Sequence, residues 1–349
     1  MSKLEKILII KMSALGDVFM ALPHVEVIVN HHRGEPIWIL TSPAFESLFI
    51  HHPRVKTAVL DRCGWIGEKS TIRRLFWVRK HRFTCIYDLQ GNRTSRLIVR
   101  FSTSRLIVRF SGALKRVGTQ PNEVYNFHPQ KPYAVDTQQN VFDRLNETLA
   151  AAGLPCAVPG ICRMYPSMED VDRVEEWKRE NGIETGCYAV LHAGSSSQWP
   201  SKRWPQDCFA RLAVLIEATG LRCVWVGGVA DEKVNRYLAR QVGIDATACF
   251  NLLQLYLLGR SALFAVTNDS GPMHVMAAAG IPVYSFFGPT NWIRSHAAGQ
   301  KLRVFHRDVD CSPCFRGTCP DSKGHVCLDA IDHESVFSKI QQDMNLSTA

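Results

Sequence analysis

One strand–turn–helix segment holds the residues best suited to binding a phosphate. The apolar run Leu263–Thr267 predicts a buried strand, and the turn after it contains Asp269, Ser270 and Gly271. Pro272 follows where a helix should begin, because proline is tolerated in the first helical turn, whose N–H groups lack partners. Such a turn presents backbone N–H groups and the positive end of a helix dipole, both of which attract anions.

The helix after this turn adds one titratable side chain. His274 lies one turn into the helix and can point toward the same anion site. Gly280 is expected to end the helix as a left-handed cap, and a second buried strand follows over Pro282–Phe287. An ordinary strand–helix–strand unit that binds nothing explains the same residues. A matching pattern elsewhere in the chain therefore decides between the two interpretations.

That matching pattern follows the predicted strand that ends at His192. Gly194 permits close approach of backbone to a ligand, Ser195 and Ser196 add hydroxyl donors, and Lys202 supplies a point charge. A polar surface loop is the plain alternative. Serines at a strand end together with a lysine favour a second phosphate-binding loop.

An acidic residue follows the next predicted strand, Leu221–Val226. Asp231 comes shortly after Gly227 and Gly228, where a carboxylate can accept hydrogen bonds from ribose hydroxyls. The same residue could equally supply favourable charge to the first turn of a helix. Spacing alone does not separate these two roles.

The first half of the chain offers one carboxylate at a comparable position. Gly16 and Asp17 follow the short predicted strand Lys6–Ile10, at the sheet edge where open α/β folds bind ligands. Asp17 could act as a general base toward a hydroxyl, or it could cap the helix predicted over Val18–Asn30. The loop does not match G-x-G-x-x-G, the fingerprint of dinucleotide binding. The sequence therefore does not favour an enzyme that transfers hydride.

Strands that alternate with helices must position these loops. Predicted strands at Ile37–Leu40, Val55–Leu60 and Cys85–Leu89 continue the first series, and Tyr188–His192 opens the second. This alternation predicts parallel, helix-covered sheets. A proline-rich stretch over Cys156–Pro166 separates the series as a linker.

The sequence therefore predicts two Rossmann-like domains, residues 1–160 and 167–330. A charged helix near Met168–Asn181 follows the linker. A closing helix over Glu334–Asn345, within residues 331–349, is expected to cross back onto the first half.

Composition narrows the class of protein. The chain has 349 residues, 46% of them hydrophobic, a net charge of +9 and twelve cysteines. No apolar run approaches the ~20 residues that a membrane span needs, and the apolar start Ile7–Ile10 is too short for a signal peptide. We expect a cytoplasmic protein with mostly reduced cysteines and an acidic partner: nucleotide, phosphorylated glycan, anionic membrane or nucleic acid.

One nine-residue sequence occurs twice in tandem. TSRLIVRFS spans Thr94–Ser102 and then Thr103–Ser111. Nine residues rotate a helix by about two and a half turns, so a second copy would turn the buried face outward. We expect a bulged loop or a helix with a register break. The stretch Arg93–Arg116 holds seven Arg or Lys and no acid, which is typical of a solvated face or of a surface for phosphates and anionic lipid.

A cysteine cluster lies near the C-terminus. Cys311, Cys314, Cys319 and Cys327 are separated by two, four and seven residues, with His325 among them. Four thiolates in a short loop could hold Zn²⁺ or an iron–sulfur cluster. The spacing lacks a second C-x₂-C pair, so either a structural metal site or plain reduced thiols fits the pattern.

The motifs, in order along nearly the whole chain, resemble those of the heptosyltransferases of lipopolysaccharide core synthesis, glycosyltransferase family nine. The matching blocks are KMSALGDVFMALP, DLQGN, HAGSSSQWPSKRWP, TNDSGPMHVMAAAGIP and FFGPTN. The resemblance implies a GT-B fold, with two Rossmann-like domains facing each other across a cleft. It also implies ADP-heptose as donor, inversion at the anomeric carbon and no metal ion at the reaction centre.

The resemblance assigns roles by motif. Asp17 is similar to the family's catalytic base, and Asp231 takes the position that contacts the ribose. The implied contacts to the rest of the donor are Ser195, Ser196, Lys202, Asp269, Ser270, Gly271 and His274. The implied acceptor is a hydroxyl of the lipid A–core oligosaccharide. Because that acceptor is phosphorylated and lies in an anionic leaflet, the basic net charge predicts a protein peripherally associated with the inner membrane.

Two other functions compete with this one. An enzyme of the same architecture could use another nucleotide sugar, as a transferase or an epimerase, and dependence on an acceptor separates these. A basic nucleic-acid-binding protein with a zinc-like cysteine module is also compatible with the net charge. It leaves the serine–lysine and Asp-Ser-Gly loops unexplained, and the chain lacks interleaved aromatic and basic residues, so we expect no nucleic acid partner.

Overall fold

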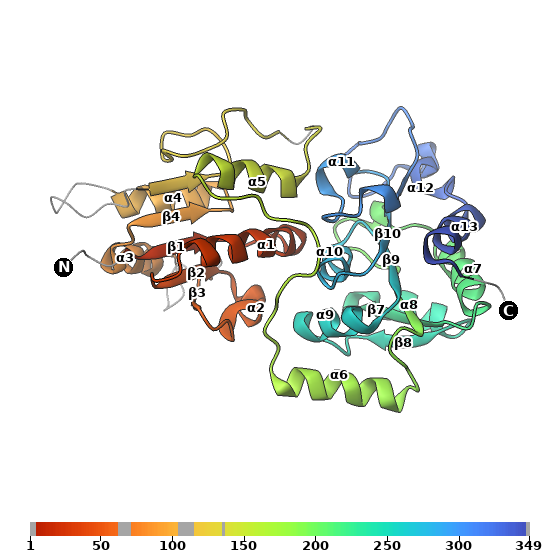
Figure 1. The fold of residues 1–349 in the computed structure, drawn as a ribbon. Coiled ribbons are helices and arrows are strands. Elements are labelled where there is room, and N and C mark those ends of the chain that lie inside the picture. The colour runs from red at the N-terminus through yellow and green to blue at the C-terminus, as the bar shows by residue number, and fades with distance from the viewer. Residues whose placement is uncertain (1–4, 62–70, 104–114, 135–136, 347–349) are drawn as a thin grey trace. The chain divides into compact units, whose positions relative to one another are not determined.

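The computed structural model describes residues 5–61, 71–103, 115–134 and 137–346 (Figure 1). The chain divides into two compact units, Met1–Pro159 with Arg163–Tyr165, and Gly160–Cys162 with Pro166–Ala349. In the described residues, each unit contains one sheet whose paired strands all run parallel. The predicted α/β class with two parallel sheets is confirmed.

The first unit has a five-stranded sheet in the order β3-β2-β1-β4-β5. Its strands are β1 (Ile7–Ile10), β2 (Ile37–Thr41), β3 (Val55–Val59), β4 (Cys85–Asp88) and β5 (Lys115–Gly118). Its helices are α1 (Leu15–His31), α2 (Ser47–Ile50), α3 (Thr71–His81), α4 (Arg93–Thr103) and α5 (Val141–Ala151).

Both faces of this sheet are buried, which explains why β1 reads as an unbroken apolar run. Leu8 and Ile10 belong to a core cluster with Val78 of α3 and Ile98 of α4. Ile7 and its alternate neighbours point to the opposite face, since successive side chains of a strand alternate, and they are fully buried too. A strand covered on both sides carries no polar alternation.

The second unit has a six-stranded sheet in the order β11-β10-β9-β6-β7-β8. Its strands are β6 (Tyr188–His192), β7 (Arg222–Gly227), β8 (Ile244–Thr247), β9 (Phe264–Asn268), β10 (Val283–Phe287) and β11 (Val304–His306). Its helices are α6 (Met168–Glu180), α7 (Gln206–Glu217), α8 (Glu232–Ala239), α9 (Leu252–Ser261), α10 (Gly271–Ala278), α11 (Trp292–Ser295), α12 (Val326–Asp329) and α13 (His333–Met344).

Aromatic side chains fill one face of this second sheet. Trp204 stacks on Phe286 at 4.1 Å between ring centroids and meets Phe209 of α7 edge-on at 5.0 Å. All three belong to one cluster of buried residues in this unit. This core holds the strand ends of β9 and β10 firmly, and those ends carry the loops described below.

The closing helix corrects one expectation. Helix α13 belongs to the second unit and packs against α7, as Figure 1 shows, where we expected a return to the first half. Val336, Phe337 and Ile340 on its apolar face join the aromatic core. An amphipathic stripe predicts that a helix is buried, but it does not name the partner surface.

Most predicted strands and helices occur within one or two residues of their expected bounds. Helix α1 is an exception because it begins at Leu15, three residues before the expected start. Ala14 is its N-cap, so Asp17 lies inside the first turn and is not the N-cap. Gly280 has φ +87°, as the left-handed cap after α10 requires.

The tandem repeat is described only in part. Its first copy lies in α4, which continues to Thr103. The second copy begins at Thr103, and the rest of it, residues 104–111, lies outside the described part of the chain. No described helix is both long enough and apolar enough to cross a membrane.

Candidate active site

Three loops of the second unit meet at one sheet edge. Strand β9 pairs with β6 on one side and β10 on the other, all parallel, so the residues after His192, Asn268 and Phe287 emerge together. These are the serine loop, the Asp-Ser-Gly turn and the GPTN turn. The sheet thus assembles the two predicted phosphate loops, and the carboxyl edge is where open α/β sheets bind ligands.

Asn268 joins two of these loops and is not among the residues predicted for the site. Its fully buried side chain donates from Nδ2 to Ala193 O (2.9 Å) and Gly194 O (3.0 Å). Its Oδ1 accepts from Trp204 N at 2.9 Å. One amide therefore fixes both ends of the serine loop, and the signal for it was only an Asn at the end of a buried strand.

Lys202 and Asp269 form the charged centre of the site. Lys202 Nζ lies 2.7 Å from Asp269 Oδ2, and the two side chains are 19% and 8% exposed. Thr290 of the GPTN turn donates its hydroxyl to the same oxygen at 2.6 Å. Three loops thus contribute one residue each, and the lysine charge is held at the sheet edge.

The turn before α10 leaves its helix end available to a ligand. Ser270 is the N-cap but makes no side-chain cap hydrogen bond. Its hydroxyl instead donates to Asn268 O (3.1 Å) and lies 3.0 Å from His192 Nδ1. Gly271 opens the helix and Pro272 follows within its first turn. The N–H groups of that turn are consequently not used by the cap side chain.

Asp231 faces inward beneath the serine loop. Its Oδ2 accepts from Gly228 N (3.0 Å) and lies 3.5 Å from His192 Nε2. A Cβ on Gly194 would come within 2.0 Å of its Oδ1, so this close approach requires glycine. Burial works to raise the pKa of Asp231, but the contacts with His192 and the Gly228 N–H outweigh it and lower that pKa. Its proposed contact with ribose stays a prediction.

The remaining donor candidates differ in exposure. Ser196 is exposed, whereas Ser195 is buried and donates to Trp199 O at 2.8 Å. Arg203 Nε donates to the Ser195 hydroxyl at 3.1 Å. His274 is buried one turn into α10, as predicted. Of the two serines, only Ser196 is exposed, and the donor contact proposed for each of them stays a prediction.

In the first unit, Asp17 is partly exposed in the first turn of α1. The loop before α1 is held by Gln90, whose Oε1 accepts from Met12 N (2.8 Å) and Ser13 N (2.9 Å). Strands β1 and β4 are parallel neighbours, so their C-terminal ends lie side by side. The DLQGN block therefore positions the loop that leads to Asp17.

Asp88 fixes the backbone of the DLQGN block through hydrogen bonds. It is fully buried, and its Oδ1 accepts from Gln90 N (3.0 Å) and Gly91 N (2.9 Å). Tyr125 donates its hydroxyl to Oδ2 at 2.5 Å. Burial raises the pKa of Asp88 despite these donors. The hydrogen bonds shape the turn that presents Gln90.

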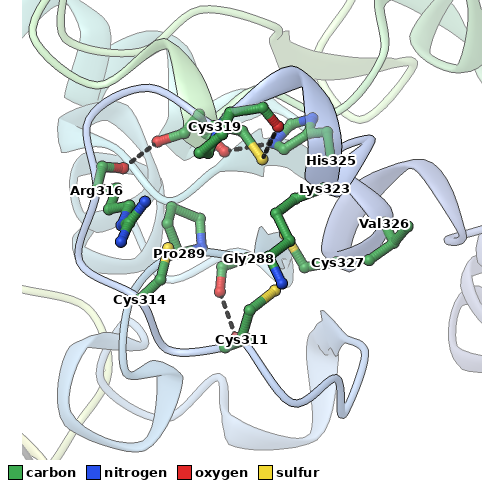
Figure 2. A pocket seen from close by; sticks show the side chains of 13 residues that line it. Gly288, Pro289, Cys311, Cys314, Arg316, Cys319, Lys323, His325, Val326 and Cys327 are labelled. Carbon is green, nitrogen blue, oxygen red and sulfur yellow. Dashed lines mark hydrogen bonds between the residues drawn. The ribbon is translucent and has the colours of Figure 1, made fainter.

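The four candidate metal ligands line a single cavity of about 320 Å³ in the second unit (Figure 2). They are Cys311, Cys314, Cys319 and Cys327. No three of their sulfur atoms lie within 4.8 Å of one another. Elsewhere in the described chain, Glu5, His32 and Glu35 do bring three ligand atoms that close, but His32 Nε2 already bonds the Tyr87 hydroxyl.

Two parallel sheets, one of them with a lysine beside a helix N-terminus at its carboxyl edge, are typical of α/β proteins that bind nucleotides. Comparison with known proteins identifies this protein further. The model of glycosyltransferase family 9 (heptosyltransferase) matches residues 72–325. The chain belongs to this family, and the protein is a glycosyltransferase.

Individual relatives agree with the family. Lipooligosaccharide heptosyltransferase 2 of Campylobacter jejuni is 27% identical, over 41% of this chain and 47% of its own length. The chain thus spans about half the length of that relative. Lipopolysaccharide heptosyltransferase 1 of Campylobacter coli is 24% identical over 97% of this chain and 98% of its own.

Solved structures share the fold. A glycosyltransferase family 9 protein from Veillonella parvula has a TM-score of 0.76 at 19% identity, covering 97% of both chains. The E. coli heptosyltransferase WaaC with ADP-2-deoxy-2-fluoro heptose has a TM-score of 0.65 at 18% identity, covering 97% of this chain and 99% of its own. These matches support the predicted GT-B fold.

Proposed function

We propose that this protein transfers heptose from ADP-heptose to a hydroxyl of the lipopolysaccharide inner core, with inversion. The observation that carries the proposal is the cluster of Lys202, Asp269 and Thr290 beside the N-terminus of α10. A relative of the same fold holds an ADP-heptose analogue, which supports the choice of donor. The second unit would bind the nucleotide sugar, and the first would bind the acceptor.

The donor's diphosphate would take its countercharge from this cluster. Lys202 would contact it directly, and the first-turn N–H groups after Ser270 would donate to its oxygens. Gly271 would admit the backbone close to the phosphate, and the exposed Ser196 hydroxyl would add a donor. Positive charge fixed in advance stabilises a leaving diphosphate without reorganisation during the reaction. The proposed transfer therefore uses no metal ion at the reacting centre.

Asp17 would act as the general base. It would take the proton of the acceptor hydroxyl while that oxygen attacks the anomeric carbon of heptose. The bond from this carbon to the diphosphate oxygen breaks, and its electron pair leaves with ADP. One displacement from the opposite face inverts the anomeric configuration.

A direct assay tests this function. Purified protein is incubated with ADP-heptose and a lipopolysaccharide acceptor that lacks inner-core heptose. The mass of the product is then measured by mass spectrometry. We expect one heptose added per acceptor and equimolar ADP. Product from UDP- or GDP-sugars, with none from ADP-heptose, would contradict the donor assignment. Turnover of donor without acceptor would indicate an epimerase.

We also propose peripheral attachment to an anionic membrane surface. The net charge of +9 supports it, because anionic lipids attract basic proteins. Binding to vesicles with anionic lipid should weaken as salt rises, since salt screens such attraction. Binding that is insensitive to salt, or equal on neutral vesicles, would contradict this attachment.

A further inference from the structure

Helices α3 and α4 of the first unit share an uneven charge pattern. Thr71–His81 contains four Arg or Lys and Arg93–Thr103 contains three, and neither helix contains an Asp or Glu. The two helices pack against each other and cover the same face of the sheet, since Val78 of α3 and Ile98 of α4 belong to one core cluster with β1. Their solvent-facing sides therefore lie next to each other.

Large apolar side chains stand on these solvent-facing sides. Ile72 and Phe76 of α3 are 48% and 62% exposed, and Leu97 of α4 is 48% exposed. Residues four apart share one side of a helix, which places Ile72 beside Phe76 and Leu97 beside Phe101. The Phe76 ring meets the Phe101 ring edge-on, at 5.9 Å between centroids. The three exposed side chains thus form one patch that spans both helices.

Cations accompany these apolar side chains. Arg73 and Lys80 are exposed on α3, and Arg93 is exposed on α4. Arg100 forms an ion pair with Glu123 at 3.4 Å, which offsets one charge only, so the two helices keep a clear excess of cations. We define the α3–α4 patch as Ile72, Arg73, Phe76, Lys80, Arg93 and Leu97.

This mixture of side chains fits an anionic lipid surface. Lipid phosphates attract Lys and Arg, and apolar side chains gain from burial at the boundary between headgroups and acyl chains. Long Lys and Arg side chains can reach from that boundary to the headgroups. Nucleic acids bind cations together with stacking or hydrogen-bonding side chains. Ile72 and Leu97 are aliphatic and provide neither, so the patch favours lipid.

We propose that the α3–α4 patch docks the protein on an anionic lipid bilayer. Its cations face the phosphate headgroups, while Ile72, Phe76 and Leu97 enter the layer between headgroups and acyl chains. This inference rests on the peripheral attachment proposed above and names the surface responsible, which net charge alone does not identify. The attachment then lies in the unit proposed to bind the acceptor, on helices that carry none of the donor-site residues.

Sedimentation with vesicles tests the surface without any activity. Vesicles of phosphatidylglycerol mixed with phosphatidylcholine supply the anionic surface, and pure phosphatidylcholine vesicles are the neutral reference. Each cation near such a surface contributes about fivefold to binding, so the double variant Arg73→Gln, Lys80→Gln should bind anionic vesicles roughly 25-fold more weakly than wild type.

A charge-matched variant is the control for this loss. Arg179→Gln, Arg240→Gln removes the same net charge from exposed residues of the second unit and should bind anionic vesicles like wild type. Equal loss in both double variants would overturn the patch, because it would show that only net charge matters. Wild-type protein that binds no anionic vesicle, or binds neutral vesicles equally well, would overturn it too.

The apolar side chains have their own matched pair of variants. Because burial of a whole isoleucine side chain contributes more than about tenfold and Ile72 is half covered already, Ile72→Ser should weaken vesicle binding roughly 4- to 10-fold. Ile50→Ser is the control, since Ile50 lies on α2 and is 55% exposed. It should bind like wild type. Unchanged binding of Ile72→Ser would overturn the insertion of apolar side chains and the choice of lipid.

A measurement on the wild-type protein covers the case that a variant fails to fold. Hydroxyl-radical footprinting oxidises exposed side chains, and vesicles with saturated acyl chains do not consume the radical at double bonds. Anionic vesicles should protect Ile72, Phe76 and Leu97 from oxidation. Val214 of α7, which is 54% exposed, should stay reactive. Protection of Val214 without protection of the patch would overturn the proposed surface.

Failure of the surface and failure of the proposed transfer reaction are distinguishable. Ile72→Ser should transfer heptose to a soluble core oligosaccharide as wild type does, but with a lower kcat/KM to the same acceptor embedded in anionic vesicles. An unchanged kcat/KM with the embedded acceptor would overturn the patch. If wild type transfers heptose to neither acceptor while the vesicle results hold, the proposed function fails and the docking surface is supported.

Discussion

Lys202 Nζ lies 2.7 Å from Asp269 Oδ2, so the cation proposed to meet the diphosphate is already paired with a carboxylate from the next strand end. The Thr290 hydroxyl shares that carboxylate. This arrangement keeps an extended lysine in place before any ligand arrives. Preorganisation of this kind lowers the entropy cost of binding.

Replacement of Lys202 should weaken donor binding. In Lys202→Ala the diphosphate loses its cation and meets the negative charge of Asp269 directly. Hydrogen bonds to charged groups contribute about 1.5–3 kcal/mol, so ADP affinity should fall by roughly 10- to 100-fold. Isothermal titration measures this change. Lys301→Ala, which removes an exposed lysine elsewhere in the unit, should bind ADP like wild type. Equal ADP affinity in both variants would show that Lys202 does not bind the donor.

The sheet edge could be predicted from sequence because strand ends are local features. Buried runs, glycines and the Ser-Gly-Pro turn mark where strand gives way to helix near Asp269 and Gly194. Side-chain pairing could not be predicted, since it depends on strand order. Asn268, which joins the serine loop to the next turn, became visible only when β6 and β9 proved to be neighbours.

Long-range packing limited the prediction elsewhere. The period of residues 334–345 predicted a helix correctly, yet its partner α7 is more than a hundred residues away in the sequence. The start of α1 was placed late because Asp17 looks like an N-cap. The structure instead has Ala14 there, whose side chain makes no cap hydrogen bond.

Gln90 should act as a positioning residue for Asp17. Gln90→Leu removes the acceptor for Met12 N and Ser13 N, so the loop before α1 should shift. Because a misplacement of about 1 Å can cost up to about 100-fold in rate, we expect kcat to fall roughly tenfold or more. ADP affinity should not change, because the donor site lies in the other unit.

Gln90→Glu provides the control for this variant. It keeps an Oε1 acceptor in place and should recover much of the lost kcat. A kcat for Gln90→Leu equal to that of wild type would show that the loop does not need this side chain. A parallel loss of ADP affinity would indicate general unfolding.

The base assignment has a clear mutational test. Asp17→Asn keeps the shape of the side chain but cannot accept the hydroxyl proton. General bases contribute about 10²- to 10⁴-fold, so transfer should fall by at least ~100-fold while ADP-heptose binding survives. Product is measured by mass spectrometry and binding by titration. Turnover near the wild-type rate would exclude Asp17 as the base.

His24 should make the first unit sensitive to acid. Its ring is fully buried in α1, and burial lowers the pKa from 6.5 to about 4. Between these pH values the unfolded chain binds a proton that the folded chain does not, so stability falls as pH falls. The loss should reach about 3 kcal/mol by pH 4.

Urea unfolding between pH 7 and 4 measures this dependence. In His24→Gln, the free energy of unfolding that is lost between pH 7 and 4 should be smaller than in wild type by the contribution of His24. His31→Gln, which changes an exposed histidine on the same helix, should keep the wild-type dependence. Identical curves for wild type and His24→Gln would contradict the assignment.

Isothermal titration with ADP, UDP, GDP and ADP-heptose tests the central proposal most directly. We predict saturable binding of ADP and ADP-heptose, and much weaker binding of UDP and GDP. A preference for UDP or GDP would keep the family and the fold but contradict the heptose donor. No binding of any nucleotide would contradict a donor site at Lys202 and Asp269.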